Sequence, residues 1–244
     1  MTLHDVSLFG DQIVASRLAA KFANVDTTQF LRLAIKDLFP GRIALVSSFG
    51  ADSAVLLHMI SQIDKATPVV FVDTKHLFPE TLAYRDQLVE LLGLTNIDTA
   101  YPDTDELAAK DPENFLWAKD TDACCEIRKV LPLAKTLKGY EAWITGRKRF
   151  QADTRAQLPL FETDGDRVKV NPLANWNATR LLEYLDAHHL PRHSLVAKGY
   201  PSIGCLPCTS PVRPGEDPRA GRWRGRGKTE CGIHTTTLDA GSDI

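Results

Sequence analysis

The sequence has no uninterrupted run of 18 apolar residues, and its first ten residues lack the basic segment and apolar stretch of a secretory signal. We therefore expect a cytoplasmic protein with no membrane partner. Neither sign of charge is in excess, since 29 basic residues stand against 31 acidic ones. This balance argues against a protein that coats nucleic acid. Only five cysteines occur in 244 residues, an odd number and too few for a disulfide scaffold.

What the chain does contain is an alternation of short apolar runs and helical patterns. Apolar runs at 42–47, 68–72, 96–101 and 141–145 predict strands, while residues 1–40 and 79–92 have helical patterns. The alternation favours an α/β fold in which a parallel sheet is sandwiched between helices on both faces. We expect one α/β domain that covers residues 1–208.

The composition changes near the C-terminus. Residues 209–228 include three prolines, four glycines and six basic residues. Such a segment has little apolar surface to bury, so we predict a mobile tail over residues 209–244.

A glycine-containing loop, Ser-Ser-Phe-Gly-Ala-Asp-Ser, follows the first predicted strand at residues 47–53. Glycine permits a tight turn there, and a helix N-terminus offers free N–H groups to an anion. No Gly-Lys-Ser/Thr follows, so this is not a Walker loop. Taken alone, the loop is also compatible with an N-cap turn that binds nothing. The candidate phosphate contacts are Ser47, Ser48, Phe49, Gly50, Asp52 and Ser53.

A basic loop follows the fourth predicted strand and offers further phosphate contacts. Its basic residues are Arg147, Lys148, Arg149 and Arg155.

The cysteines form two pairs and one isolated residue. Cys124 and Cys125 are adjacent, and Cys205 and Cys208 form a Cys-x-x-Cys pair after 79 intervening residues. Four such thiolates suit zinc or an iron–sulfur cluster. Adjacent side chains on a helix diverge by about 100°, which favours separate irons of a cubane over two corners of one zinc tetrahedron. Cys231 stands alone in Lys-Thr-Glu-Cys-Gly-Ile-His, where neighbouring basic groups favour its thiolate.

The loop at 47–53 resembles the PP-loop of the adenine nucleotide alpha hydrolases. Together with Cys-Cys-Glu-Ile-Arg-Lys, Cys-Leu-Pro-Cys and Lys-Thr-Glu-Cys-Gly-Ile-His, in that order, it resembles the assimilatory sulfonucleotide reductases, in particular their iron–sulfur branch that acts on adenylyl sulfate (APS). The resemblance extends over about residues 42–234 and implies the alpha hydrolase-like fold. It also implies a 4Fe–4S cluster on Cys124, Cys125, Cys205 and Cys208.

The same resemblance implies roles for other residues. Cys231 would be the nucleophile and His234 an active-site histidine, while Lys129 would link the cluster to the substrate. Arg219 and Arg222 match the substrate-binding arginines, and Asp73 and Thr74 match the end of the strand that meets the nucleotide. The family more often has an acidic residue where Phe150 stands, which leaves the roles of Arg147 and Arg155 open.

The implied activity is the reduction of APS to sulfite and AMP, with thioredoxin as the electron donor and an S-sulfocysteine intermediate on the enzyme. Two alternatives remain at this point. One is a cluster-bearing enzyme that uses phosphoadenylyl sulfate (PAPS) as well or instead, and the other is a zinc-stapled adenylate-binding protein without turnover. The sequence leaves open whether the chain forms a homo-oligomer.

Overall fold

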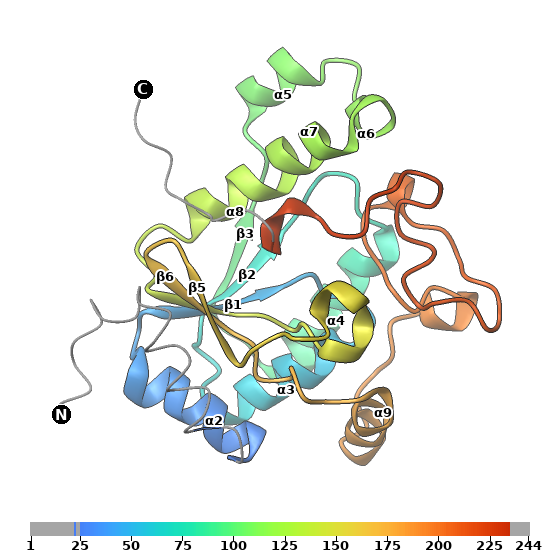
Figure 1. Cartoon of the computed structure of the whole chain (residues 1–244). Helices are drawn as coiled ribbons and strands as arrows, with labels where there is room; N and C mark the ends of the chain where they lie inside the picture. The colour runs from blue at the N-terminus through green and yellow to red at the C-terminus, as the bar shows by residue number, and fades with distance from the viewer. Residues whose placement is uncertain (1–21, 23–24, 235–244) are drawn as a thin grey trace.

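The computed structural model describes residue 22 and residues 25–234, so much of the predicted helical pattern at 1–40 lies outside the described residues. A six-stranded sheet forms the centre of the molecule (Figure 1). Its strands are β1 (Ile43–Ser47), β2 (Val69–Val72), β3 (Ile97–Ala100), β4 (Ala142–Ile144), β5 (Phe161–Asp164) and β6 (Arg167–Val170). Their order is β3-β2-β1-β4-β6-β5, and every neighbouring pair is parallel except β5 and β6. The predicted α/β fold is confirmed.

Helices cover both faces of this sheet. Their bounds are α2 (Thr27–Leu33), α3 (Ser53–Ile63), α4 (Pro79–Leu92), α5 (Thr104–Lys110), α6 (Leu116–Lys119), α7 (Thr121–Cys125), α8 (Leu131–Thr136) and α9 (Ala178–Ala187). Two π-helical turns interrupt the series, η2 (Ala34–Leu38) and η3 (Glu126–Val130). Short 3₁₀ turns are η4 (Arg149–Gln151), η5 (Asp153–Arg155), η6 (Val196–Lys198), η7 (Leu206–Cys208) and η8 (Gly232–His234). Among the described residues, no helix has the length and apolar character needed to span a bilayer.

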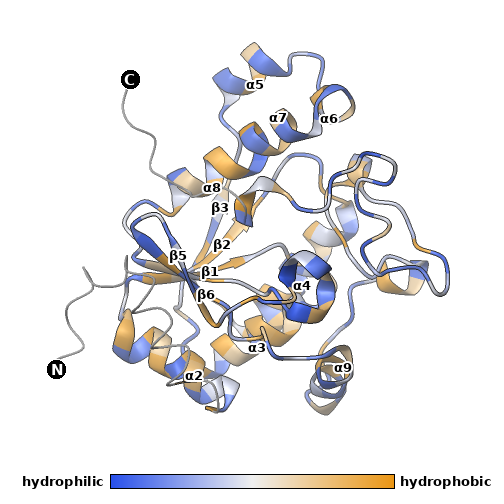
Figure 2. Cartoon of the chain, viewed as in Figure 1, coloured by the Kyte–Doolittle hydropathy of each residue, from blue (hydrophilic) through white to orange (hydrophobic). Residues whose placement is uncertain are grey.

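The central strands are apolar on both sides, which explains their continuous apolar runs. In β1, Ile43 and Leu45 belong to the core that contains side chains of α2, α3, α4 and α9, whereas Ala44 belongs to the core beneath α8. Trp143 of β4 is fully buried in the α8 core. Figure 2 shows this pattern as hydrophobic strands flanked by helices with mixed surfaces.

The hairpin of β5 and β6 was not predicted. Its two-residue turn is Gly165-Asp166, in which Gly165 has a φ of 61° that favours glycine. A Gly-Asp pair between two strand-like runs is a hairpin signal that the sequence offered.

The strand order places a crevice at the centre of the sheet. The chain runs from β1 outward to β2 and β3 and then returns to β4 on the other side of β1. In open α/β sheets, ligands bind outside the carboxyl ends of the strands where the order reverses in this way. The loops after β1 and β4 therefore lie where a ligand is expected.

The segment 209–234 packs across these strand ends, shown in orange to red in Figure 1. The Ser210 N–H donates to the Gly221 carbonyl at 2.9 Å, and the Trp223 N–H donates to the Cys208 carbonyl at 2.9 Å. Trp223 is only 2% exposed. The mobility of the tail stays a prediction, and its residues 235–244 lie outside the described part of the chain.

Candidate active site

A cavity of about 410 Å³ opens at the carboxyl ends of β1 and β4. Its walls are the loop after β1, the loop after β4, the start of the Cys-x-x-Cys turn and the C-terminal segment. The predicted site residues that line it are Ser47, Ser48, Gly50, Asp52, Ser53, Thr74, Lys129, Arg147, Arg155, Cys205, Arg219, Arg222, Cys231 and His234.

Phe49 and Asp73, two of the candidate substrate contacts at strand ends, do not line this cavity. Phe49 is fully buried and packs edge-on against Phe71, with ring centroids 5.3 Å apart. Phe49 has a φ of 46°, which gives the loop a sharp turn. Its buried side chain therefore supports the loop from the core and does not face the cavity. Asp73 is also buried, and its carboxylate accepts the Lys75 N–H at 2.9 Å.

Asp52 of the loop after β1 pairs with Lys148 of the loop after β4, whose Nζ lies 2.8 Å from the Asp52 carboxylate. Lys148 is 2% exposed, and burial lowers its pKa although Asp52 opposes the shift. The pair therefore joins the two loops. Lys148 already has an anionic partner, and Arg149 donates to the Leu158 carbonyl at 2.8 Å instead of entering the cavity.

Two further basic side chains in the cavity wall also have acidic partners. Arg147 pairs with Glu162 of β5, and burial is the main cause that lowers the pKa of this guanidinium. Arg155 donates to both oxygens of Glu230 at 2.6 and 2.7 Å. Arg219 reaches the same carboxylate at 3.3 Å.

Lys129 and Arg222 differ, because no ion pair within the described part of the chain includes either. Lys129 is 8% exposed, and its Nζ lies 5.8 Å from the Trp223 ring centroid. The Arg222 guanidinium stacks 4.5 Å from that centroid, and its Nη1 donates to the Ile203 carbonyl at 3.3 Å. Its buried Nε has no hydrogen-bond partner among the residues that the structure describes. A buried cation without an ionic partner is costly, so the buried Lys129, with the half-buried Arg222, suits an anionic ligand.

The four paired cysteines line a second, very small cavity of about 10 Å³, to which Lys129 also contributes. Cys124 and Cys125 end α7 and precede the π-helical turn η3, while Cys205 precedes the turn η7 and Cys208 ends it. Among the described residues, no three His, Cys, Asp or Glu side chains are arranged to hold a single metal ion. Four thiols that line one small cavity, three of them buried, nevertheless provide the donor set of a cubane cluster, in which each cysteine binds a different iron.

Burial and mutual repulsion disfavour four free thiolates at this point. Desolvation, followed by the neighbouring Cys125 and Cys205, raises the pKa of Cys124 to about 12. Desolvation also raises the pKa of Cys125 and of Cys208. A positively charged cofactor would relieve this repulsion, because metal ions bind the thiolate form.

Cys231 directly precedes the turn η8. It lies between Glu230 and two residues of that turn, Ile233 and His234, which pack into the fold. Ile233 packs against the core beneath α8, and the His234 ring stacks on Trp143 with an interplanar angle of 9°. Burial lowers the pKa of His234 well below its ordinary value. Four surrounding basic side chains, Arg147, Arg155, Lys169 and Arg219, lower it further. His234 is therefore neutral at pH 7, and its buried Nδ1 has no hydrogen-bond partner within the described part of the chain.

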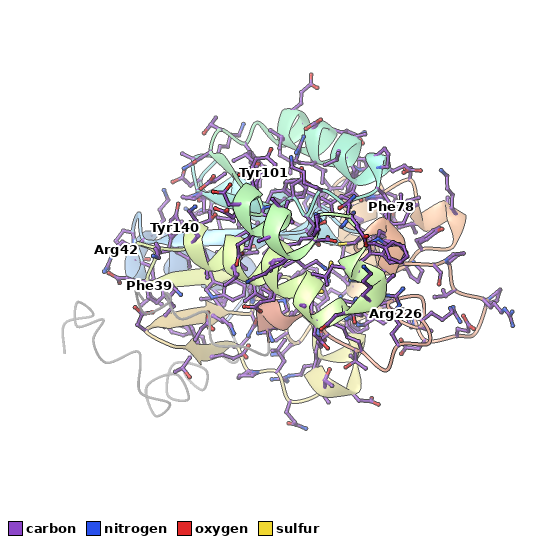
Figure 3. The ribbon with its side chains drawn as sticks, turned by 90° about the horizontal axis from the view of Figure 1, so that it is seen from above. Phe39, Arg42, Phe78, Tyr101, Tyr140 and Arg226 are labelled. Carbon is purple, nitrogen blue, oxygen red and sulfur yellow. The ribbon has the colours of Figure 1, made fainter. Side chains whose placement is uncertain are left out.

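The basic stretch before Cys231 is held by α7, which carries the adjacent cysteines, and by α6. Lys228 pairs with Asp122 of α7, and Arg226 donates to the Trp117 carbonyl of α6. Figure 3 shows Arg226 at the same end of the molecule as Phe78 and opposite Phe39 and Arg42, which precede β1. The C-terminal segment thus bridges the cysteine helices and the cavity.

Sequence reasoning missed Glu230, Trp223 and Trp143 as parts of this site. Glu230 was visible only as the neighbour of Cys231, and its arginine partner lies 75 residues away. Trp223 lies in a segment that is otherwise rich in glycine and proline. A tryptophan there indicates packing, but the overall composition of the segment hid this signal.

The protein is therefore an α/β protein with a cavity suited to an anionic ligand at the point where its strand order reverses. Four cysteines line a second cavity, and the fifth cysteine, Cys231, lines the first. Residues 42–211 match the phosphoadenosine phosphosulfate reductase domain. The chain belongs to this family.

Named relatives agree with that assignment. The chain is 53% identical over 225 residues to the adenosine 5′-phosphosulfate reductase of Mesorhizobium japonicum, covering 92% of this chain and 89% of the relative. It is 51% identical to the adenosine 5′-phosphosulfate reductase of Chelativorans sp., covering 94% of each chain. The crystal structure of PAPS reductase from Candida auris, in a phosphate complex, superposes with a TM-score of 0.70 at 28% identity, covering 83% of this chain and 98% of that one.

Proposed function

We propose that this protein reduces adenosine 5′-phosphosulfate to sulfite and AMP. The proposal rests on the residues that line one cavity. They are the loop after β1, the Cys231 thiol, and Lys129 and Arg222, which have no ion-pair partner among the described residues. The names of relatives at 51% and 53% identity support the same substrate.

In the proposed reaction, the Cys231 thiolate attacks the sulfur atom of the sulfate group. The bond between that sulfur and the bridging oxygen breaks, and AMP leaves with the electron pair, so Cys231 becomes an S-sulfocysteine. The approaching thiolate and the phosphosulfate are both anionic. Lys129, Arg219 and Arg222 reduce their repulsion by binding the phosphosulfate end.

A second stage releases the product and restores the cysteine. A thiol of thioredoxin attacks the Cys231 sulfur, sulfite departs, and a mixed disulfide forms. The second thioredoxin thiol then resolves it, so that two electrons come from the thioredoxin dithiol. Cys231 is partly exposed. A mobile C-terminal segment, which would present it to thioredoxin, belongs to this proposal.

The four paired cysteines would hold a 4Fe–4S cluster, whose positive core would offset the charge of the thiolates and would link α7 rigidly to the turn η7. Lys129 lines both the thiol cavity and the substrate cavity, so it is placed to connect the two. A brown protein with broad absorption near about 400 nm supports the cluster, whereas a colourless protein with stoichiometric zinc contradicts it.

Replacement of Cys231 by serine tests the proposal. We expect Cys231→Ser to abolish sulfite release from adenosine 5′-phosphosulfate, with little change in the absorption near about 400 nm or in AMP binding. Cys208→Ser is the matched control, since it should lose iron. Appreciable turnover by Cys231→Ser, or its loss of iron, would mean that nucleophile and ligand had been confused.

A further inference from the structure

The residue before Cys231, Glu230, forms a bidentate and largely buried ion pair. Both oxygens of Glu230 accept hydrogen bonds from Arg155, at 2.6 Å from Nε and 2.7 Å from Nη2. The side chains of Glu230 and Arg155 are each 10% exposed. Bidentate pairs between arginine and a carboxylate fix geometry as well as charge.

Arg155 is anchored independently of the C-terminal segment. It belongs to the turn η5 after β4, and its Nη1 donates to the Gln151 side chain at 2.7 Å. Arg219 adds a second connection, because its Nη2 donates to the Thr229 carbonyl at 2.8 Å and lies 3.3 Å from Glu230. Two segments far apart in the sequence, the turn η5 and the C-terminal segment, therefore meet at one carboxylate.

Cys231 is consequently held from both sides. Glu230 precedes it in the arginine clamp, and Ile233 and His234 follow it in the packing against Trp143. Loss of the clamp would free one side of the cysteine and leave Arg155 buried without its anion, which is unfavourable.

We propose that Glu230 is a positioning residue. Its carboxylate, bound by Arg155 and Arg219, holds Cys231 over the cavity. On this proposal, Arg155 binds Glu230 and does not bind the substrate. The inference deepens the proposed function, since it assigns the group that places the nucleophile. An alternative is that Glu230 mimics the substrate and is displaced by it. The pairing pattern favours positioning, because Lys129 and Arg222 remain without carboxylate partners among the described residues while Arg155 already has one.

The test measures alkylation of Cys231 by iodoacetamide in the free holoenzyme, followed by mass spectrometry. Trypsin cleavage after Lys228 isolates Cys231 from the other four cysteines, because residues 229–244 contain no other. We expect Glu230→Gln to accelerate alkylation by about 10- to 150-fold, the range for losing one charge-assisted hydrogen bond. Glu230→Asp, which keeps the charge, should fall between wild type and Glu230→Gln.

Glu216→Gln is the matched control. Glu216 lies in the same segment and pairs with Arg224 at 2.9 Å, but that pair is more exposed and remote from Cys231. Its alkylation rate should equal that of the wild type. Unchanged absorption near about 400 nm in all variants establishes that the thiol cavity is intact.

A second measurement separates positioning from substrate mimicry. In a Cys231→Ser background, Glu230→Gln should leave the affinity for adenosine 5′-phosphosulfate the same or weaker, whereas tighter binding would show that Glu230 competes with the substrate and would overturn the proposal. An alkylation rate of Glu230→Gln within twofold of the wild type would overturn it as well. Neither result depends on sulfite release, so failure of the proposed reaction would be recognised separately.

Discussion

Gly204, which precedes the Cys-x-x-Cys turn, provides the space for the Arg222 guanidinium. A Cβ atom at Gly204 would lie 2.3 Å from Nη2 and 2.4 Å from Cζ of Arg222. Ordinary contacts begin at 3.4 Å, so the guanidinium would have to retreat by roughly 1 Å. Gly204→Ala therefore moves this cation without removing its charge.

The expected effect falls on function more than on stability. The clashing atoms are the far end of a flexible side chain, so the backbone need not move. A misplacement of about 1 Å in a positioning group reduces turnover by up to about 100-fold, and a lost charge-assisted hydrogen bond by about 10- to 150-fold. We expect kcat/KM for sulfite release to fall by about 10- to 100-fold, with Tm lowered by only a few degrees.

A double-mutant comparison checks this reasoning. In an Arg222→Ala background, Gly204→Ala should cause a further loss of no more than about twofold, because the group it displaces is already absent. Losses that multiply in the double variant would refute the steric link between the two residues. A loss of absorption near about 400 nm in Gly204→Ala alone would instead locate the damage at Cys205.

Three other predictions follow from the charges and packing of the site. Lys129→Ala should weaken binding of adenosine 5′-phosphosulfate by about 10- to 150-fold but AMP binding much less, and equal losses would make Lys129 a general nucleotide anchor. Trypsin cleavage of Cys231→Ser protein between Arg219 and Lys228 should slow when adenosine 5′-phosphosulfate is added and slow less with AMP, because bound anions favour the packed tail. Equal cleavage rates in the free and both bound forms would contradict a tail that closes over the substrate. Packing of the His234 ring against Trp143 should weaken as the pH falls below about 6.5. Burial and four basic neighbours lower the pKa of the packed ring, so protonation favours the state in which the ring is released. Hydrogen exchange at residues 229–234, corrected for intrinsic rates, should therefore be faster at pH 5.5 than at pH 7.5, and His234→Gln should remove the difference.

The parallel part of the fold could be predicted because its strands are buried on both faces. Continuous apolar runs such as 68–72 mark such strands directly, and the strand at Val69–Val72 lies within the predicted range. The helix predicted at 79–92 has these bounds, since Pro79 suits the first turn and Gly93 ends it with a φ of 63°. Local signals were sufficient in both cases.

The C-terminal segment could not be predicted from composition alone. Its glycines and prolines suggested that it has little to bury, but Trp223 is almost fully buried, with Arg222 and Lys228 near its ring. Gly221 contributes in the same way, because a Cβ there would lie 2.0 Å from the Ser210 carbonyl oxygen. Such close approaches depend on tertiary contacts, which residue composition does not encode.

The cavity's charge pairing bears on which nucleotide the protein accepts. Among the described residues, six lysine and arginine side chains line it: Lys129, Arg147, Lys148, Arg155, Arg219 and Arg222. Within that part of the chain, three have a close carboxylate partner and a fourth shares one, which leaves two without an ion-pair partner. These two, with the shared arginine, suit the two negative charges of a phosphosulfate.

A 3′-phosphate adds further negative charge, and desolvating it requires another unpaired cation. Among the described residues that line the cavity, the pairing leaves none in reserve. We therefore expect sulfite release to have a kcat/KM at least about tenfold higher with adenosine 5′-phosphosulfate than with its 3′-phosphorylated analogue, since one unpaired charge contributes about 1.5–3 kcal/mol. Steady-state assays with both nucleotides at equal ionic strength measure the ratio. Equal values would mean that the 3′ position lies in solvent, or that one of the ion pairs opens to receive it.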